Sequence, residues 1–397
     1  MHIVMLNNAT APDKLGGLER YVRELAASLV RSGTEVTIVA KRVNDDYPSD
    51  ETAADGVRVL RYGVPTKKDP TFALRYPGSV MAGVRRALRQ AGPRSVLHAH
   101  FPVPALVPVL DRQPFVYTLH APVYRELLGE RQGTYVLPRP VQSVAEQMLK
   151  RAEAVVVRRA SHIITLSQFM RGEVATLDPA AGDRVQILAG GIDTDHFVPA
   201  PAEPRRDGPV LFTARRLVPR TGVAQLVAAM PAILAAHPGC RLVIAGDGLQ
   251  RDHIAAEIER LGVGGSVSMV GRISNGELLV GYQQADLVVT PTQELEGFGL
   301  ATAEALACGT PCLVTPAGAN PELVSGLSSK LVAADVSPVA MAAAVISLLG
   351  DPELLATLKP RCRPAVDPAM GWPAIAEQHR ELYATIAGRT RSLSTTS

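Results

Sequence analysis

The sequence predicts an α/β protein that consists of two Rossmann-like, doubly wound domains. Three observations support this. The chain opens with a strand, a glycine loop, a helix and a second strand. A Pro-rich stretch without periodicity interrupts it at residues 198–208, and a second series of strands and helical stretches follows. The chain has 397 residues, of which 47% are hydrophobic and 20% are charged. It is therefore long enough for two domains that each bury a core.

The first domain is predicted over residues 1–197. An apolar run at 2–6 indicates a buried strand, apolar residues recur with a helical period over 18–30, and residues 35–40 alternate as a strand does. The polar loop between the first strand and the helix ends in Gly16 and Gly17. Further strands are expected at 57–60, 96–98, 115–118 and 162–165.

The second domain is predicted over residues 209–370, after a linker at 198–208. Its expected strands are 210–213, 241–245, 267–270, 287–290 and 311–314. Residues 371–386 form an amphipathic closing helix, so we assign 371–397 to the first domain. Trp372 is expected to anchor this helix by packing, and the tail after Arg389 is expected to fray.

Composition and charge exclude several classes of protein. The net charge is +3, from 41 Lys and Arg against 38 Asp and Glu, which is too balanced for a protein that binds nucleic acid. The four cysteines form no CxxC pair, so we expect reduced thiols and neither a disulfide nor a zinc site. We expect no signal peptide, no stable membrane insertion and a cytoplasmic location. The basic stretch with Arg85, Arg86, Arg89 and Arg94 predicts a solvated face, with peripheral contact to an anionic membrane as the alternative.

The pattern with the clearest chemistry lies at residues 287–311. An apolar strand runs into a loop with Glu294 and Glu296, and Gly-Phe-Gly at 297–299 opens a helix that contains Glu304. The N-terminus of a helix offers unpaired amides to an anion, and carboxylates accept hydrogen bonds from sugar hydroxyls. This spacing suits a ligand with both phosphates and hydroxyls. The alternative is a Glu296 that is merely favoured by the helix dipole and a solvated Glu304.

Glu296-x7-Glu304 with Gly-Phe-Gly between the two carboxylates resembles the signature of the retaining GT-B glycosyltransferases of glycosyltransferase family 4. Other segments match motifs of that family in the same order along the chain, over residues 2 to about 385. They are Gly16-Gly17, Thr118-Leu119-His120-Ala121, Ser167-Gln168, Gly191 to Phe197, Arg216 to Gly222, Gly246-Asp247-Gly248 and Gly318 to Glu322.

The resemblance implies that a nucleotide diphospho-sugar binds in a cleft between the domains, mostly on the second one. Glu296 would hold hydroxyls of the donor sugar, Glu304 the ribose hydroxyls, and Arg216 would neutralise the diphosphate. His120 would lie near the transferred sugar, and we assign His120, Glu296 and Arg216 as catalytic. The donor-binding set is Gly16, Gly17, Arg215, Arg220, Thr221, Gly271, Arg272, Gly297, Phe298, Gly299, Leu300 and Glu304.

The same resemblance implies a retaining transfer in which the leaving phosphate receives the proton of the acceptor hydroxyl, without a metal ion or other cofactor. We expect a UDP-sugar donor rather than a GDP-sugar. The acceptor is expected to be a small natural product, a lipid or a glycan. The sequence does not indicate the oligomeric state.

One departure from the family bears on this interpretation. Thr221 stands where the family has a phosphate-binding Lys, and a hydroxyl carries no charge. Arg215 or Arg220 could compensate. The alternatives are a retaining sugar phosphorylase of the same architecture, or a partner protein that keeps the fold and has lost turnover. Gly190 also replaces the usual Asn of the family.

Three short motifs allow a structural interpretation beside a functional one. Asp193-Thr194-Asp195 has the form of a metal-binding DxD, but its place within the 191–197 match argues against a metal. His98-Ala99-His100 predicts histidines that pack at the end of a strand, with contact to the acceptor as the alternative. His120, taken alone, would also be a structural histidine.

Overall fold

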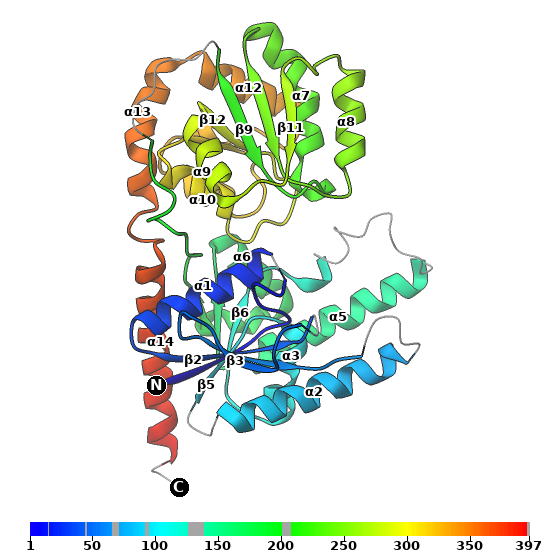
Figure 1. Cartoon of the computed structure of the whole chain (residues 1–397), viewed down its shortest axis with the longest axis vertical. Coiled ribbons are helices and arrows are strands. Elements are labelled where there is room, and N and C mark those ends of the chain that lie inside the picture. The colour runs from blue at the N-terminus through cyan, green and yellow to red at the C-terminus, as the bar shows by residue number, and fades with distance from the viewer. Residues whose placement is uncertain are drawn as a thin grey trace. The chain divides into compact units, whose positions relative to one another are not determined.

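The computed structural model describes residues 1–14, 16–43, 46–65, 71–91, 95–125, 139–200 and 208–394. The chain divides into two compact units. The first contains the described residues of Met1–Tyr124, Leu137–Gly191 and Trp372–Ser397, and the second contains those of Arg125–Val136 and Ile192–Gly371. Each unit is built around its own parallel sheet (Figure 1). The predicted fold class, two Rossmann-like α/β domains, is confirmed.

The sheet of the first unit has the strand order β3-β4-β2-β1-β5-β6-β7-β8. The strands are β1 His2–Leu6, β2 Glu35–Lys41, β3 Asp50–Thr52, β4 Arg58–Tyr62, β5 Ser95–Ala99, β6 Val116–Leu119, β7 His162–Thr165 and β8 Val185–Ile187. All pair in parallel except β3, which pairs with β4 antiparallel. The order reverses between β1 and β5, so the loops after these two strands diverge at the carboxyl edge, where such sheets bind ligands.

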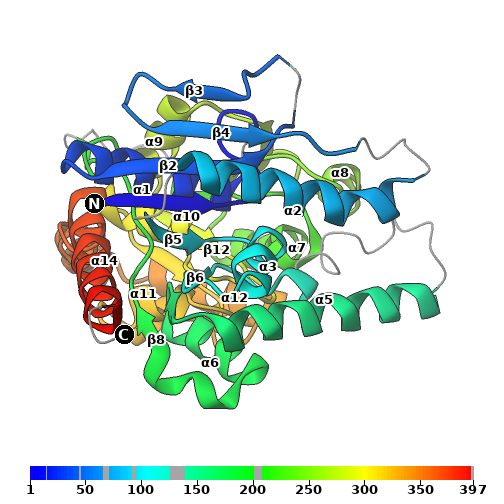
Figure 2. The ribbon, with the colours of Figure 1, turned by 90° about the horizontal axis from the view of Figure 1, so that it is seen from below.

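Helices cover both faces of this sheet (Figures 1 and 2). α1 Gly17–Arg31 and α14 Trp372–Ser394 lie together on one face, and α2 Phe72–Ala91, α3 Pro102–Leu110, α5 Arg139–Arg159 and α6 Gln168–Leu177 lie on the other. The predicted anchor is confirmed: Trp372 is buried, and its ring lies 5.5 Å from that of Tyr21. α14 continues to Ser394, beyond the point where we expected it to fray.

The sheet of the second unit has the order β11-β10-β9-β12-β13 and is parallel throughout. Its strands are β9 Val210–Ala214, β10 Arg241–Ala245, β11 Val267–Gly271, β12 Leu287–Thr290 and β13 Cys312–Val314. Its helices are α7 Val223–Ala236, α8 Arg251–Arg260, α9 Asn275–Gln284, α10 Leu300–Ala307, α11 Asn320–Val324, α12 Pro338–Leu349 and α13 Pro352–Cys362. Here the order reverses between β9 and β12.

Residues 192–197 cluster with the second unit, whereas the sequence interpretation placed them at the end of the first domain. Arg363 explains their position, because its guanidinium donates to the carbonyls of Phe197 at 2.8 Å and Thr194 at 2.9 Å. The amide of Ile192 also donates to the carbonyl of Met370 at 2.8 Å. These bonds tie the segment to the end of the second unit, and most of the predicted linker, residues 201–207, lies outside the described residues.

The surface features expected from the sequence can be located only in part. All four cysteines are free and buried. Arg85 forms an exposed ion pair with Asp111 at 2.5 Å, and Arg94 lies outside the described residues. Across the part of the chain that the structure describes, no single helix is both long and apolar enough to cross a membrane. The bent pair Pro338–Leu349 and Pro352–Ala365 passes by length and composition alone.

Candidate functional site

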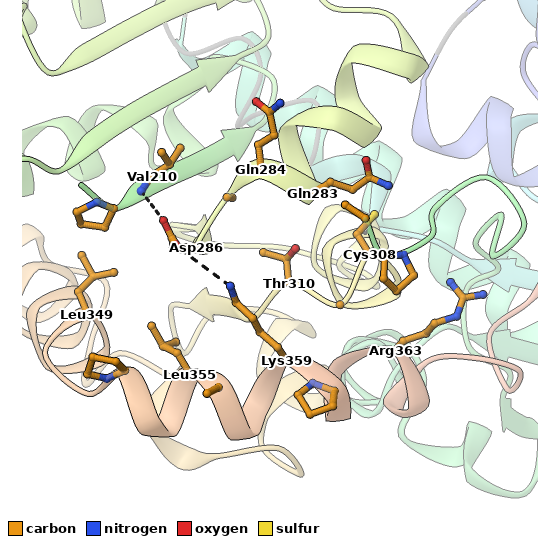
Figure 3. A pocket seen from close by; sticks show the side chains of 18 of the residues that line it. Val210, Gln283, Gln284, Asp286, Cys308, Thr310, Leu349, Leu355, Lys359 and Arg363 are labelled. Atoms are coloured by element: carbon orange, nitrogen blue, oxygen red, sulfur yellow. Dashed lines mark hydrogen bonds and ion pairs between the residues drawn. The ribbon is translucent and has the colours of Figure 1, made fainter. Parts of the chain in front are cut away.

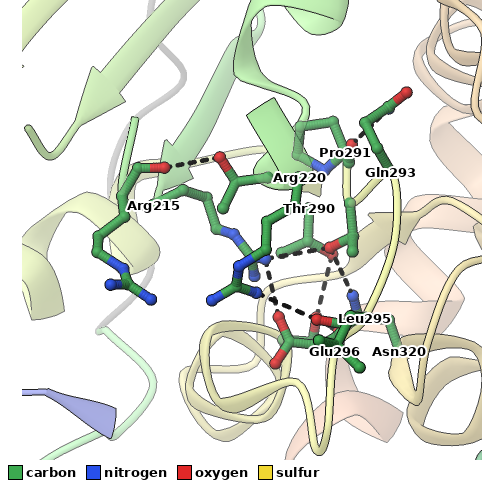
Figure 4. A network of polar contacts seen from close by, with 12 residues as sticks. Arg215, Arg220, Thr290, Pro291, Gln293, Leu295, Glu296 and Asn320 are labelled. Atoms are coloured by element: carbon green, nitrogen blue, oxygen red, sulfur yellow. Dashed lines mark hydrogen bonds and ion pairs between the residues drawn. The ribbon is translucent and has the colours of Figure 1, made fainter. Parts of the chain in front are cut away.

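In the second unit, the loops that follow β9 and β12 meet through an ion pair (Figure 4). Arg215 is the first residue after β9, and its Nη2 donates to Oε2 of Glu296 at 2.8 Å and to Oγ1 of Thr292 at 3.1 Å. The Arg215 side chain is 8% exposed and that of Glu296 is 19% exposed. The reversal of strand order between β9 and β12 thus holds a cation and a carboxylate together at the carboxyl edge.

The Glu296 carboxyl is held in its ionised form. Burial raises its pKa, but the charge and hydrogen bond of Arg215 outweigh this effect and leave the pKa below its usual value. The charge of Arg220 and a hydrogen bond from the Gly299 amide act in the same direction. Glu296 is therefore a hydrogen-bond acceptor at neutral pH.

Glycines allow the backbone to approach closely around this pair. Gly222 precedes α7 with φ of 75°, and a Cβ there would collide with the carbonyl oxygen of Pro291. Gly299 precedes α10 with φ of 92°, and a Cβ there would collide with Oδ1 of Asn320. Both positions therefore need glycine, which enters the left-handed region without strain.

The amino end of α10 stands beside Glu296. Gly299 provides no side-chain cap for it, and Leu300 is the first helical residue. Gly297 lies in the loop before the helix, while Phe298 is buried. Nearby, Asn320 donates to Thr292 at 3.0 Å and accepts from Thr302 at 3.0 Å. These two hydrogen bonds connect the loop after β12 to α10 and α11. The first turn of α10 therefore begins beside Glu296 without a side-chain cap on its amides.

Thr221 is buried, and its hydroxyl belongs to the turn that contains it. The single hydroxyl hydrogen is shared between the carbonyls of Arg216 at 2.6 Å and Val218 at 2.7 Å. A hydroxyl used in this way has no hydrogen left for a phosphate oxygen. Arg216 is exposed at the start of this turn, and Arg220 donates to the carbonyl of Leu295 at 3.1 Å. The cations of the loop are therefore its three arginines, and Arg215 forms an ion pair with Glu296.

Glu304 is 3% exposed, which corrects the alternative in which it is solvated. It lies inside α10, and its Oε2 accepts from the hydroxyl of the buried Tyr282 at 3.1 Å. Burial and the neighbouring carboxylate raise the pKa of Tyr282 well above its usual value, so the phenol stays protonated and remains the donor. The sequence did not indicate Tyr282, because it lies in α9 and is brought to Glu304 only by packing.

Gly271 and Arg272 lie at the carboxyl end of β11. The Gly271 carbonyl accepts from the amide of Gly246 at 2.7 Å, which joins the loops after β10 and β11. The Nε of Arg272 lies 3.4 Å from Asp247, and the Arg272 side chain is 86% exposed. These two residues therefore follow a strand that is two positions from β9, which precedes Arg215, and three positions from β12, which precedes Glu296.

In the first unit, Gly16 and Gly17 lie at the start of α1. A Cβ on Gly16 would collide with a carboxylate oxygen of Glu19, which is itself buried and bound by Lys14 at 2.6 Å. An internal carboxylate thus already occupies the space beside Gly16. Gly17 has open space where a side chain would begin.

His120 follows β6 in the first unit and belongs to a cluster with His98, His100 and His379. Its Nε2 lies 3.1 Å from Nδ1 of His100, and the ring of Tyr21 meets it edge-on with centroids 4.7 Å apart. Burial, followed by the influence of His379, lowers the pKa of His120 to about 3. His120 is therefore a neutral imidazole at physiological pH, with a hydrogen bond to His100.

His98 packs near the end of β5, as expected, and His379 packs beside it from α14. His98 lies in β5 with both ring nitrogens engaged, one by Tyr383 at 2.6 Å and the other by Thr118 at 2.7 Å. His379 lies in α14, where its Nδ1 donates to the carbonyl of Ile375 at 2.8 Å. Burial lowers the pKa of His98 well below its usual value and that of His379 to about 4. Sequence reasoning missed His379 and Tyr21, which are 358 positions apart.

Asp193 caps a turn, since its Oδ1 accepts from the amide of His196 at 3.0 Å. Within the described ranges, no group of three or more His, Cys, Asp or Glu side chains is placed to hold a metal ion. Asp193, Thr194 and Asp195 therefore belong to the turn at the start of the second unit.

A pocket of about 1060 Å³ lies at the opposite edge of the second sheet (Figure 3). Asp286, just before β12, accepts from the amide of Val210 at 2.9 Å and lies 4.0 Å from Lys359. Pro199, Ala200 and Gly208 also line it, on either side of the undescribed residues 201–207. Because it lies at the amino ends of the strands, this pocket is separate from the loops with Arg215 and Glu296.

The two Rossmann-like units, together with the family profiles that match them, define a glycosyltransferase of GT-B architecture. The family profile described as Glycosyltransferase Family 4 matches residues 15–196, and the one described as Glycosyl transferases group 1 matches residues 197–363. D-inositol 3-phosphate glycosyltransferase from Thermobispora bispora is 30% identical over 396 residues, which cover 93% of this chain and 89% of the relative. The chain therefore belongs to the group 1 glycosyltransferases.

Solved structures show the same fold. Sucrose-phosphate synthase from Thermosynechococcus elongatus matches with a TM-score of 0.81 at 22% identity, covering 100% of both chains. HepE from Anabaena, in complex with UDP-glucose, matches with a TM-score of 0.74 at 19% identity, covering 97% of this chain and 100% of that chain.

Proposed function

We propose that this chain is a retaining glycosyltransferase of family 4 that moves a sugar from a nucleotide diphospho-sugar to a hydroxyl group. The observation that carries the proposal is the Arg215–Glu296 pair beside the amino end of α10, at 2.8 Å. It combines an acceptor for sugar hydroxyls with a cation and backbone amides for phosphate oxygens.

Glu296 is proposed to bind the donor sugar. Its ionised carboxylate accepts hydrogen bonds and is oriented by Arg215 from one side and by the Gly299 amide from the other. A carboxylate held in one orientation distinguishes hydroxyls by their position on the sugar ring. The adjacent backbone of Phe298 to Leu300 would contact the sugar or the diphosphate.

The diphosphate is proposed to interact with the arginines of the 215–220 loop. In the reaction, the bond between the sugar C1 and the phosphate oxygen breaks while the acceptor oxygen forms its bond to C1 on the same face. The proton of the acceptor passes to the leaving phosphate. Negative charge builds up on that phosphate, and preorganised guanidinium groups and helix amides stabilise it. Three arginines would replace the charge that Thr221 lacks.

His120 is proposed to contact the reacting sugar as a neutral imidazole. A pKa of about 3 leaves no imidazolium at neutral pH. His120 can therefore position a hydroxyl by hydrogen bonding. The proton of the acceptor hydroxyl passes to the leaving phosphate, not to His120. Glu304, oriented by Tyr282, is proposed for the ribose hydroxyls.

We further propose UDP as the nucleotide and no requirement for a metal ion. The HepE complex with UDP-glucose supports the choice of UDP. Thermal unfolding with UDP, GDP, ADP and TDP and their sugar conjugates, each with Mg²⁺ and with EDTA, tests both points. UDP at 100 times its dissociation constant should add about 2.7 kcal/mol of stability in either medium. Stabilisation by GDP alone, or only with Mg²⁺, would contradict the proposal.

Glu296→Gln tests the sugar contact directly. It keeps the size of the side chain but removes the charge, so transfer should fall by at least about 100-fold, as for other preorganised catalytic groups. Glu294→Gln, an exposed residue of the same loop, is the matched control and should transfer normally. Near-normal turnover of Glu296→Gln would exclude the assigned site.

A small hydroxylated acceptor is proposed. The relative that is named D-inositol 3-phosphate glycosyltransferase supports this choice, because its name specifies a phosphorylated cyclitol. Incubation with the donor identified above and with cyclitol phosphates, lipid-linked sugars or oligosaccharides distinguishes the three acceptor classes. Transfer to oligosaccharides alone would contradict a small acceptor.

The phosphorylase and the inactive partner make different predictions in the same assays. A phosphorylase would break a glycoside with inorganic phosphate and would gain no stability from UDP. An inactive partner would bind UDP and transfer nothing until a companion protein is added. The Thr221 hydroxyl donates to carbonyls of its own turn, and this observation supports testing for an inactive partner.

A further inference from the structure

His100 follows β5 and faces His120, which follows the neighbouring strand β6. Its Nδ1 lies 3.1 Å from the Nε2 of His120. Its other nitrogen, Nε2, is buried and has no hydrogen-bond partner among the described residues. The ring also lies against His98, with centroids 3.9 Å apart. Among the described residues, the side chain of His100 therefore has a single polar contact, and that contact is with the proposed catalytic histidine.

The contact restricts which nitrogen of each ring carries the hydrogen. Both rings are neutral, because burial and the neighbouring histidines lower the pKa of His100 well below its usual value and that of His120 to about 3. One nitrogen of the pair must then donate and the other accept. If His100 carried its hydrogen on Nε2, it would leave a buried N–H without an acceptor, which folded proteins avoid more strictly than an unused lone pair. The hydrogen of His100 therefore belongs on Nδ1.

We propose that His100 is a positioning residue for His120, an inference that rests on the proposed role of His120 in transfer. The Nδ1–H of His100 donates to Nε2 of His120, so the hydrogen of His120 is placed on its own Nδ1. His120 then offers an N–H donor, not a lone pair, to a hydroxyl or ring oxygen of the reacting sugar. The hydrogen bond at one ring nitrogen thus decides whether the other nitrogen carries a hydrogen, as it does in metal-binding and catalytic histidines.

The surrounding groups hold the pair in this arrangement. Both nitrogens of His98 are engaged by Tyr383 and Thr118, so His98 offers no hydrogen bond to the buried nitrogen of His100. The ring of Tyr21 meets His120 edge-on and, at 6.1 Å, also faces His100. The Tyr21 hydroxyl lies 3.4 Å from the Nε2 of His379. Because Nδ1 of His379 donates to Ile375, the Tyr21 hydroxyl is the donor in that contact.

Nitrogen NMR of the full chain with labelled histidine tests the inference in the wild-type protein. The signals of His120 are assigned by their loss in His120→Gln. We expect His120 to carry its hydrogen on Nδ1. Observation of the Nε2–H form of His120 would overturn the inference without any need for a further variant.

Two variants of His100 add a functional readout. His100→Leu removes the hydrogen bond that selects one tautomer of His120. The NMR signals of His120 should then show a mixture of both tautomers, and kcat should fall about 10- to 100-fold, the usual range for partners of functional histidines. His100→Asn keeps an N–H donor near the position of Nδ1 and should preserve both the tautomer and most of kcat. UDP affinity, which is proposed to come mainly from the second unit, should stay unchanged in both variants.

The outcomes separate this inference from the proposed function. His100→Leu with an unchanged tautomer and unchanged kcat would refute a positioning role. A loss of kcat in both variants with an unchanged tautomer would show a structural role only, and would also refute it. If the wild-type protein transfers no sugar, the proposed function fails, and the NMR measurement still decides how His100 and His120 share their hydrogens.

Discussion

The Arg215–Glu296 pair allows a quantitative prediction about stability. Arg215→Met and Glu296→Gln each remove one charge and keep most of the volume. Two unit charges about 4 Å apart attract by about 4 kcal/mol at the effective dielectric of a protein surface, and residual hydration and desolvation reduce the net value. With side chains 8% and 19% exposed, we expect a coupling free energy of about 1–3 kcal/mol in the double-mutant cycle.

The coupling should also depend on pH. The pKa of Glu296 is lower in the folded chain, since Arg215 outweighs the effect of burial. The stabilisation is thus fully present above the unfolded carboxyl pKa of about 4.3 and is lost as the pH falls through the folded value. The coupling should be constant from pH 7 to 5 and decline below about pH 4.

Hydrogen exchange of peptides from the second unit is a suitable assay, because it reports on that unit even when the chain does not unfold in two states. The four chains of the cycle are compared at pH 7, and the thermal unfolding midpoint is followed down to pH 3. Additive single effects, with a coupling below about 0.3 kcal/mol, would refute the reasoning. A coupling that persists below the folded pKa would refute the assignment to an ionised Glu296.

Three further predictions concern the stability of the second unit, measured as the free energy of unfolding. Gly222→Ala should lower it by more than about 2 kcal/mol, because alanine is strained at φ of 75° and collides with a backbone carbonyl. The control Gly326→Ala, which has open space at Cβ, should change it by less than about 0.5 kcal/mol. Tyr282→Phe should lower it by about 1–3 kcal/mol, because Glu304 loses a buried donor, and an unchanged value would exclude that bond. Arg363→Met should lower it by about 2 kcal/mol or more, because three backbone carbonyls lose a donor. The protection of residues 192–197 from hydrogen exchange should fall at the same time. Unaltered protection would show that Arg363 does not hold this segment.

The regular elements of the sheets could be predicted because each carries a local pattern. The strands at 2–6, 162–165 and 287–290 are apolar runs between turn residues, and their observed bounds match the expected ones. The edge strands β3 and β8 could not be predicted in this way. Each has three residues, and both are largely exposed or half-buried, so they lack the apolar signal of a core strand.

The candidate site was predictable where the residues are close in sequence and unpredictable where they are not. The spacing of Glu296 and Glu304 around a glycine turn indicated a carboxylate beside a helix terminus. The bond from Arg215 to Glu296 spans 81 positions, and it depends on β9 and β12 being neighbours in the sheet. The inward hydroxyl of Thr221 depends on the local turn geometry, which its residue type alone does not specify.

The first unit is discontinuous, since α14 returns to it after residues 192–371, the main segment of the second unit. During synthesis, these 180 residues leave the ribosome before Trp372, His379 and Tyr383 do. At about 5–20 residues per second, the delay is roughly 10–40 s. Until then, Tyr21 and His98 lack the partners that enclose them in the folded chain, and their apolar surroundings stay open to chaperones. The second unit can therefore complete its core before α14 closes the histidine cluster of the first unit.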